Sequence, residues 1–338
     1  MYNLKEVYAT ISFDYDKIRL LVVEQKDNGR INCLYYNHLQ ISYLNEDLSF
    51  NCTSKLVETV DSLVRQADKF LSTNIKRYIL NISCLPLKSV NLKSSESLIF
   101  GPLNNATATN CVNRVLDSGK NVHEMLLQVI PSKWYVDGKS YDVFPEGTIG
   151  KKISFDYVGL TCSVKVVNQF IDLLNTLNVK VLATTCNSLC LNACNIAKNN
   201  AVIVDVKYTR TLINVYDENG YIKYIHELPI GFMAYMANLK RILTIPQNVD
   251  IIDIVKKIRS MNEIDANIPL INFHGDNFLE IKEATASNIL AAVHHANKKM
   301  LDVIYNAIVD VRKQFPDLPK VVRVNAIEEF VEVSSYLD

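Results

Sequence analysis

Short apolar runs separated by polar turns occur in the same order at two places along the chain. In the second place the predicted strands are Ala201–Val206, Thr211–Tyr216 and Tyr221–Glu227. Asp217–Gly220 has the composition of the turn between the last two. Residues 7–42 repeat this plan, with their turn at Lys26–Gly29. We therefore predict two halves that each begin with a three-stranded antiparallel meander.

Other segments repeat apolar residues every three or four positions, the period of an amphipathic helix. The predicted helices are Ser54–Leu71, Thr109–Ser118, Val166–Leu177, Asn187–Lys198, Gly231–Arg241, Val249–Met261 and Ala286–Gln314. Further strands are predicted at Arg77–Cys84, Val179–Ala183, Leu270–Phe273, Phe278–Ile281 and Lys320–Asn325. Because strand, helix and strand at these lengths form right-handed parallel crossovers, the predicted fold class is α/β.

Residues 85–161 interrupt this rhythm. They begin with a polar, extended stretch, contain one predicted helix, and hold five of the ten glycines between Gly119 and Gly159. That spacing indicates turns between β segments, so we predict a separate small α+β subdomain inserted into the first half. Trp134 and Tyr135 form either its core or an exposed contact for a partner, and the core is the interpretation we favour.

Composition narrows the functional classes. Lysines plus arginines and aspartates plus glutamates number 36 each, so the net charge is zero and no basic footprint for nucleic acid is visible. No apolar run approaches the roughly 18 residues of a membrane helix, and the N-terminus does not have the pattern of a signal peptide. We expect a cytosolic protein that does not bind nucleic acid.

Eight cysteines are scattered without paired spacing. Cys186, Cys190 and Cys194 share one predicted helical face, where they form either a metal or redox site or ordinary apolar packing. Since no fourth ligand accompanies them, we favour packing and expect no metal.

Glycine is scarce, at ten residues in 338. Loops that wrap phosphate groups use backbone N–H donors and close approach, which glycine provides without steric cost. Neither a Gly-x-Gly-x-x-Gly nor a Walker-type motif is present. The scarcity argues against an enzyme driven by nucleotide.

Two hairpins that open duplicated α/β halves, with a small insertion in the first half, are typical of the actin-like, ribonuclease H-like fold. Residues 127–150, LQVIPSKWYVDGKSYDVFPEGTIG, resemble the inserted 1C subdomain of the bacterial cell-division protein FtsA, a member of the actin-like ATPase superfamily. The matching positions are Val129-Ile130-Pro131, Tyr135, Asp137 and Pro145-x-Gly147-x-x-Gly150. Pilus-assembly actin-like proteins also carry a 1C-type insertion.

The resemblance implies four subdomains. Residues 1–83 and 163–200 correspond to subdomain 1A, and 84–162 to the insertion 1C. Residues 201–238 and 285–338 correspond to 2A, and 239–284 to 2B.

The positions that match the family's nucleotide-binding turns have lost their glycines. In the first hairpin they are Ser12, Asp14 and Lys17, and in the second they are Asp205, Lys207, Thr209 and Arg210. The adenosine-contacting glycines fall at about Asn325-Ala326. Bulky side chains occupy the volume that phosphate needs, so we expect ATP and Mg²⁺ binding to be weak or lost and no cofactor to be required.

Two arrangements of these turns remain open. Either Lys207 or Arg210 reaches Asp205 or Asp14, so that an internal ion pair fills the cleft, or these are solvent-facing turn residues. Asp205 as a lone general base is a third possibility, but no second acid is placed by motif, so we expect no catalytic residue.

The family resemblance also implies partners. FtsA binds the C-terminal tail of the tubulin-like protein FtsZ through subdomain 2B, where Lys256, Lys257 and Arg259 form a basic patch here. A solvated helix face is the alternative. FtsA also self-assembles and lies on the inner face of the cell membrane, through an amphipathic helix that this chain does not show.

We therefore expect an FtsA-like adaptor that binds FtsZ and polymerises. The alternatives are an ATP-binding enzyme of the actin superfamily, and a pilus-type assembly platform.

Overall fold

The computed structural model describes most of the chain. The described residues are 7–45, 48–83, 85–119, 123–191, 201–217, 222–245, 269–274, 281–318 and 322–326. They divide into two compact units, each considered by itself below. Residues 1–199 with 216–225 form the first unit, and residues 200–215 with 226–338 form the second.

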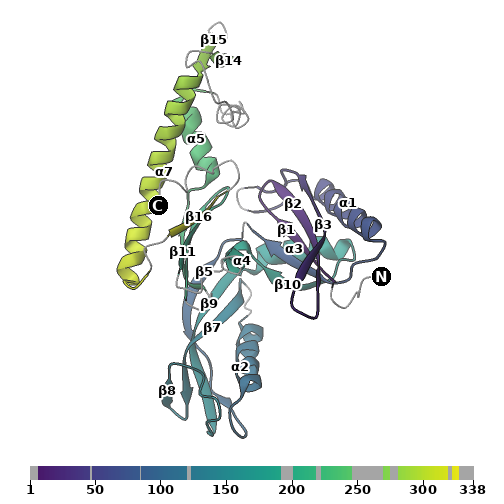
Figure 1. The fold of residues 1–338 in the computed structure, drawn as a ribbon, viewed down its shortest axis with the longest axis vertical. Coiled ribbons are helices and arrows are strands. Elements are labelled where there is room, and N and C mark those ends of the chain that lie inside the picture. Colours follow the sequence, from purple (N-terminus) through teal and green to yellow (C-terminus); the bar gives the residue numbers. More distant parts are fainter. Residues whose placement is uncertain are drawn as a thin grey trace. The chain divides into compact units, whose positions relative to one another are not determined.

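A five-stranded sheet, ordered β10-β4-β1-β2-β3, forms the centre of the first unit (Figure 1). Its strands are β1 (Val7–Phe13), β2 (Lys17–Gln25), β3 (Ile31–Gln40), β4 (Tyr78–Ile82) and β10 (Val181–Thr185). β1, β2 and β3 form the expected antiparallel meander, whereas β4 and β10 run parallel to β1. This is the crossover that the strand–helix–strand pattern predicts.

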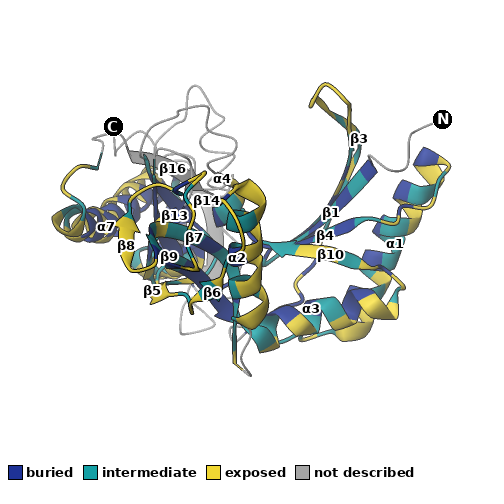
Figure 2. Cartoon of the chain, turned by 90° about the horizontal axis from the view of Figure 1, so that it is seen from below, coloured by how far each residue is buried: buried dark blue, intermediate teal, exposed yellow. Residues whose placement is uncertain are grey.

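Three helices accompany this sheet in the first unit: α1 (Thr53–Leu71), α3 (Val164–Thr176) and α4 (Asn187–Leu191). The apolar stripe of α1, which includes Leu56, Val60 and Leu63, is buried while its outer face is exposed (Figure 2). Ser72 ends α1 in the left-handed conformation, at φ 50°. The 3.6-residue period of the sequence therefore marks the buried face of this helix.

The inserted subdomain is a sheet ordered β5-β9-β7-β8, with β6 also paired to β9, and one helix. Its elements are β5 (Lys88–Lys93), β6 (Ser97–Leu98), α2 (Asn105–Ser118), β7 (Glu124–Val136), β8 (Lys139–Tyr141) and β9 (Lys152–Ser163). The α+β composition predicted for residues 85–161 is thus present. Asn104 caps α2 by accepting a hydrogen bond from the N–H of Thr107.

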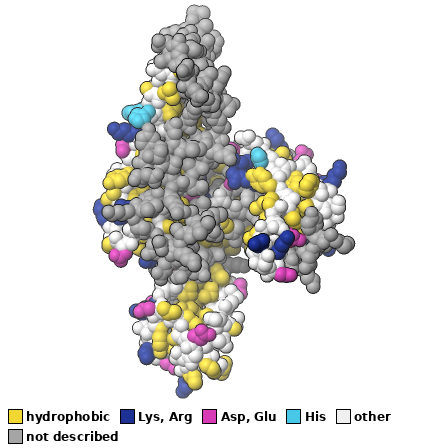
Figure 3. Space-filling view, in the orientation of Figure 1, with side chains coloured by type: hydrophobic (Ala, Val, Ile, Leu, Met, Phe, Trp, Pro, Cys, Tyr) yellow, Lys and Arg dark blue, Asp and Glu magenta, His cyan; other side chains and the backbone are white. Residues whose placement is uncertain are grey.

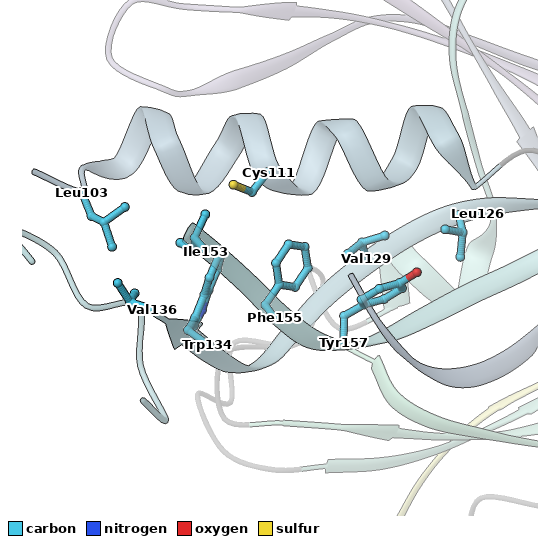
Figure 4. Packing of buried hydrophobic residues seen from close by; sticks show 9 residues of the cluster. All are labelled: Leu103, Cys111, Leu126, Val129, Trp134, Val136, Ile153, Phe155 and Tyr157. Carbon is cyan, nitrogen blue, oxygen red and sulfur yellow. The ribbon is translucent and has the colours of Figure 1, made fainter. Parts of the chain in front are cut away.

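The core of this subdomain is aromatic (Figure 4). Trp134 is 5% exposed, and its ring lies 4.7 Å from that of Phe155 and 4.9 Å from that of Phe144. The hydroxyl of the neighbouring Tyr135 donates to Asp156 at 2.6 Å. Trp134 is therefore a core residue, as favoured, and Tyr135 forms a polar contact on the sheet.

The second unit contains most of a sheet ordered β13-β12-β11-β16, which repeats a meander followed by a parallel strand. The strands are β11 (Ala201–Val206), β12 (Thr211–Tyr216), β13 (Ile222–Leu228) and β16 (Val322–Ala326). The second hairpin was predicted, and its presence confirms the duplicated plan.

Two helices and a short hairpin follow in the second unit. They are α5 (Phe232–Ile242), α7 (Ala286–Gln314), β14 (Pro269–His274) and β15 (Ile281–Thr285). The bounds of α7 are those of the predicted helix Ala286–Gln314. The side chain of Thr285 caps the start of the helix, and Pro316 follows its end. β15 begins at Ile281, where the predicted strand Phe278–Ile281 ended, and residues 278–280 lie outside the described residues. No helix among the described residues is long and apolar enough to cross a membrane.

Candidate functional site

Two hairpin turns hold the positions that match nucleotide-binding turns, and they are built alike. In the β1–β2 turn the N–H of Asp14 donates to the carbonyl of Lys17 at 2.9 Å. In the β11–β12 turn the N–H of Lys207 donates to the carbonyl of Arg210 at 2.8 Å. No residue of either turn has a positive φ. The turns therefore adopt a backbone that needs no glycine, which explains how both retain their shape with bulky side chains.

The carboxylate of Asp14 is enclosed by protein groups. It lies 2.9 Å from a guanidinium nitrogen of Arg19, and the hydroxyl of Ser83 donates to its other oxygen. The hydroxyl of Tyr43 donates to the backbone carbonyl of Asp14. Arg19 thus neutralises the buried acid of the first turn, in a position that a Mg²⁺ ion would otherwise favour.

A chain of amides lies beside this turn, at the carboxyl ends of the parallel strands. The amide nitrogen of Asn81 donates to Ser12 at 3.0 Å and to Asn187 at 2.8 Å. Ligands of open α/β sheets bind at this edge of the parallel strands. Here the polar side chains contact one another, and Ser12 serves as an acceptor for Asn81.

The second turn contains an internal ion pair. Asp205 is 2% exposed, and the ammonium of Lys207 lies 3.5 Å from one of its carboxylate oxygens. The guanidinium of Arg210 contacts Glu227 on β13 at 2.8 Å. Lys207 therefore reaches Asp205, as one of the two expected arrangements required.

Arg210 pairs with Glu227, because β13 places an acid directly beside it. The solvent-facing alternative does not hold for the two cations, since their side chains are only 10% and 14% exposed. Thr209 is partly exposed.

Helix α5 holds the second turn in place. The carbonyls of Lys207 and Tyr208 accept hydrogen bonds from the N–H groups of Phe232 and Met233, at 2.9 and 2.8 Å. Gly231 precedes the helix, and a Cβ there would lie 2.4 Å from the backbone nitrogen of Arg210. The start of a helix offers N–H groups to anions. In this protein two of those N–H groups, from Phe232 and Met233, donate to the carbonyls of the turn.

The cysteines form no metal centre among the described residues. In that part of the chain no group of three or more His, Cys, Asp or Glu side chains is placed to hold a metal ion. Cys186 is buried and Cys190 is exposed, while Cys194 lies outside the described residues. Burial raises the pKa of the nearby Cys162 thiol to about 12, so that thiol stays protonated.

Sequence reasoning missed the partners of the charged turn residues. Arg19, Glu227 and Ser83 lie on other strands or loops, and no motif marks them. The basic patch at Lys256, Lys257 and Arg259 lies outside the described residues, so its role stays a prediction.

No protein family model matches the sequence, and no curated protein sequence matches it either. Solved structures do match. A PilM–PilN type IV pilus biogenesis complex aligns with a TM-score of 0.63 and 10% identity, over 98% of this chain and 84% of that chain. EutJ, an ethanolamine utilization protein from Carboxydothermus hydrogenoformans, aligns with a TM-score of 0.50 and 13% identity, over 98% and 81%. A nucleotide-free diol dehydratase-reactivating factor aligns with a TM-score of 0.50 and 8% identity, over 98% and 95%.

These likenesses define the class of protein: the chain has the actin-like ATPase fold, as the sequence predicted. Identities of 8 to 13% show a common fold alone. The function is therefore argued from the residues of the two turns.

Proposed function

We propose that this protein is an assembly adaptor with an actin-like fold, and that its two hairpin turns serve as structure in place of a nucleotide site. One observation carries the proposal. The second turn is closed by the Lys207–Asp205 ion pair and by the hydrogen bonds from α5 to its carbonyls. A triphosphate at this turn would have to displace a buried cation from its acid and compete with bonds that are already made.

The first turn supports the same conclusion. Asp14 is neutralised by Arg19, so the carboxylate has lost the free charge with which it would attract a metal ion. We therefore propose no cofactor and no hydrolytic activity.

Isothermal titration with Mg-ATP tests the proposal. We expect no heat of binding up to about 1 mM ligand, which corresponds to a binding free energy weaker than roughly −4 kcal/mol. A double substitution, Lys207→Gly with Arg210→Gly, is the matched probe, because it removes both cations from the second turn. A micromolar dissociation constant for the unmodified protein would disprove the proposal.

The partner has two candidates within the adaptor class. The FtsA-like insertion motif supports an FtsZ-binding, self-assembling protein at the inner face of the cell membrane. The likeness to the PilM–PilN complex equally supports a pilus-type platform that works within a multi-protein complex. Co-sedimentation with FtsZ filaments separates them, since only the first candidate should pellet with the filaments.

A variant with reversed charge in the basic patch tests the FtsZ candidate further. If the basic patch holds the acidic FtsZ tail, Lys256→Glu with Lys257→Glu weakens binding of a tail peptide. Unchanged affinity removes this patch from the binding site, and the co-sedimentation result then stands alone.

A further inference from the structure

A groove of about 660 Å³ lies between α5 and α7, within the second unit. It exists because small residues occupy facing positions on the two helices, namely Ala234 and Ala237 on α5 and Ala296 on α7. Met300 and Val303 on α7 add apolar surface to its wall. Pockets of this volume suit a few large side chains or a small ligand.

The lining of the groove carries positive charge. Arg241 and Lys299 lie at its wall from opposite helices, and Arg241 is steadied by donating to the side-chain oxygen of Asn238 at 3.0 Å. No aspartate or glutamate is among the described residues that line the groove, and Asp302 lies next to the lining residue Val303 on α7. Lysine and histidine side chains are visible on the edge of α7 in Figure 3. An apolar groove whose lining carries two cations favours an acidic ligand.

We infer that this groove is the docking site of a partner protein segment that is acidic and carries apolar anchor residues. The anchors occupy the space above the exposed Ala234 and Ala237, and the segment's carboxylates meet Arg241 and Lys299. The inference rests on the proposed adaptor function, to which it adds the chemistry of one partner.

The shape of the surface favours a peptide over a lipid bilayer. A membrane surface is matched by apolar side chains that protrude, whereas this surface is hollowed between two helices. A third segment lying along two packed helices can place anchors every three or four residues into such a hollow.

Selection from a random peptide library on the full chain tests the inference. Ala237→Trp serves as the counter-selection, because it fills the groove from an exposed position. We expect the enriched peptides to be net negative and to contain two or more large apolar residues. Fluorescence anisotropy then measures their affinity for the variants.

Arg241→Glu with Lys299→Glu should weaken binding by roughly tenfold or more. Lys298→Glu is the matched control: it makes the same kind of change on the neighbouring residue of α7, which does not line the groove. We expect a change within about twofold, because the Lys298 side chain makes no part of the groove wall. Circular dichroism confirms that each variant is folded, and the exposed charge reversals remain usable if Ala237→Trp is not.

Three outcomes overturn the inference: no enriched peptide, peptides without net negative charge, or peptides that bind wild type and Ala237→Trp equally. Co-sedimentation with vesicles of phosphatidylcholine and phosphatidylserine covers lipid, and vesicle binding lost in Ala237→Trp would also overturn it. The Mg-ATP titration is independent of these assays. If no peptide binds the groove and ATP does not bind either, the inference is wrong and the proposed function stands. If ATP binds with micromolar affinity, the proposed function is wrong.

Discussion

Asp205 and Lys207, two residues of the second turn, form an ion pair. An acid at the end of a buried strand needs a counter-charge, whether from a metal ion or from a side chain. Lys207 provides that charge from within the chain at 3.5 Å.

Removing the cation alone tests this role. In Lys207→Met the carboxylate of Asp205, which is 2% exposed, loses the counter-charge of Lys207, and we expect the free energy of unfolding to fall by about 3 kcal/mol. Urea denaturation followed by circular dichroism measures the change. In Asp205→Asn with Lys207→Met no charge remains to be compensated, so most of the loss should be recovered. If Lys207→Met alone is as stable as wild type, the ion pair contributes nothing to stability.

At the scale of elements, the contact between the second turn and α5 is the feature on which the site depends. Gly231 is extended, at φ −148°, so its role is space and not backbone conformation. A Cβ at this position would meet backbone atoms of residues 207, 209 and 210 at 2.4 to 2.6 Å. The turn and the helix can therefore approach each other only if residue 231 has no side chain.

Gly231→Ala should separate these elements. We expect a loss of about 3 kcal/mol, because the neighbouring atoms are backbone and cannot rotate away. Gly29→Ala is the contrasting control: that residue has φ 75° and open space around it, so only the conformational cost of about 1 kcal/mol applies. Thermal and urea denaturation of both variants measure the difference. Equal stability of Gly231→Ala and wild type would mean that the turn moves freely.

At the scale of the whole molecule, two compact units and an inserted subdomain share one chain. The single tryptophan, Trp134, lies in the core of the insertion and so reports on the first unit alone. Circular dichroism reports on both units. The two signals together can show whether the units unfold as one or separately.

Phe155→Ala uses this property. The ring is 2% exposed and packs on Trp134, so its loss should lower the free energy of unfolding measured by fluorescence by about 3 to 5 kcal/mol. The part of the circular dichroism transition that comes from the second unit should not move. Phe100→Ala in the same subdomain is the control, because Phe100 is 93% exposed and should change stability by less than about 0.5 kcal/mol. A shift of both transitions would show that the units unfold together.

The fold class, the duplicated hairpins and the inserted subdomain could be predicted from the sequence because each is written in local patterns. Alternating burial identifies β1, a 3.6-residue period identifies α7, and clustered glycines identify the turns of the insertion. The absence of glycine from the two turns is also a local fact, and it directed attention to Asp14 and Lys207. These features depend on neighbours a few residues apart along the chain.

Only the tertiary structure decided which charges meet. Arg19 is placed beside Asp14 by the register of β1 with β2, and Glu227 beside Arg210 by the hairpin that brings β13 back. The groove depends on two helices whose facing residues are about 60 positions apart, and their separate patterns do not show that small residues will face one another. Sequence determines which residues are buried on each element, whereas side-chain partners follow from how the elements pack, because packing joins residues that have no common local pattern.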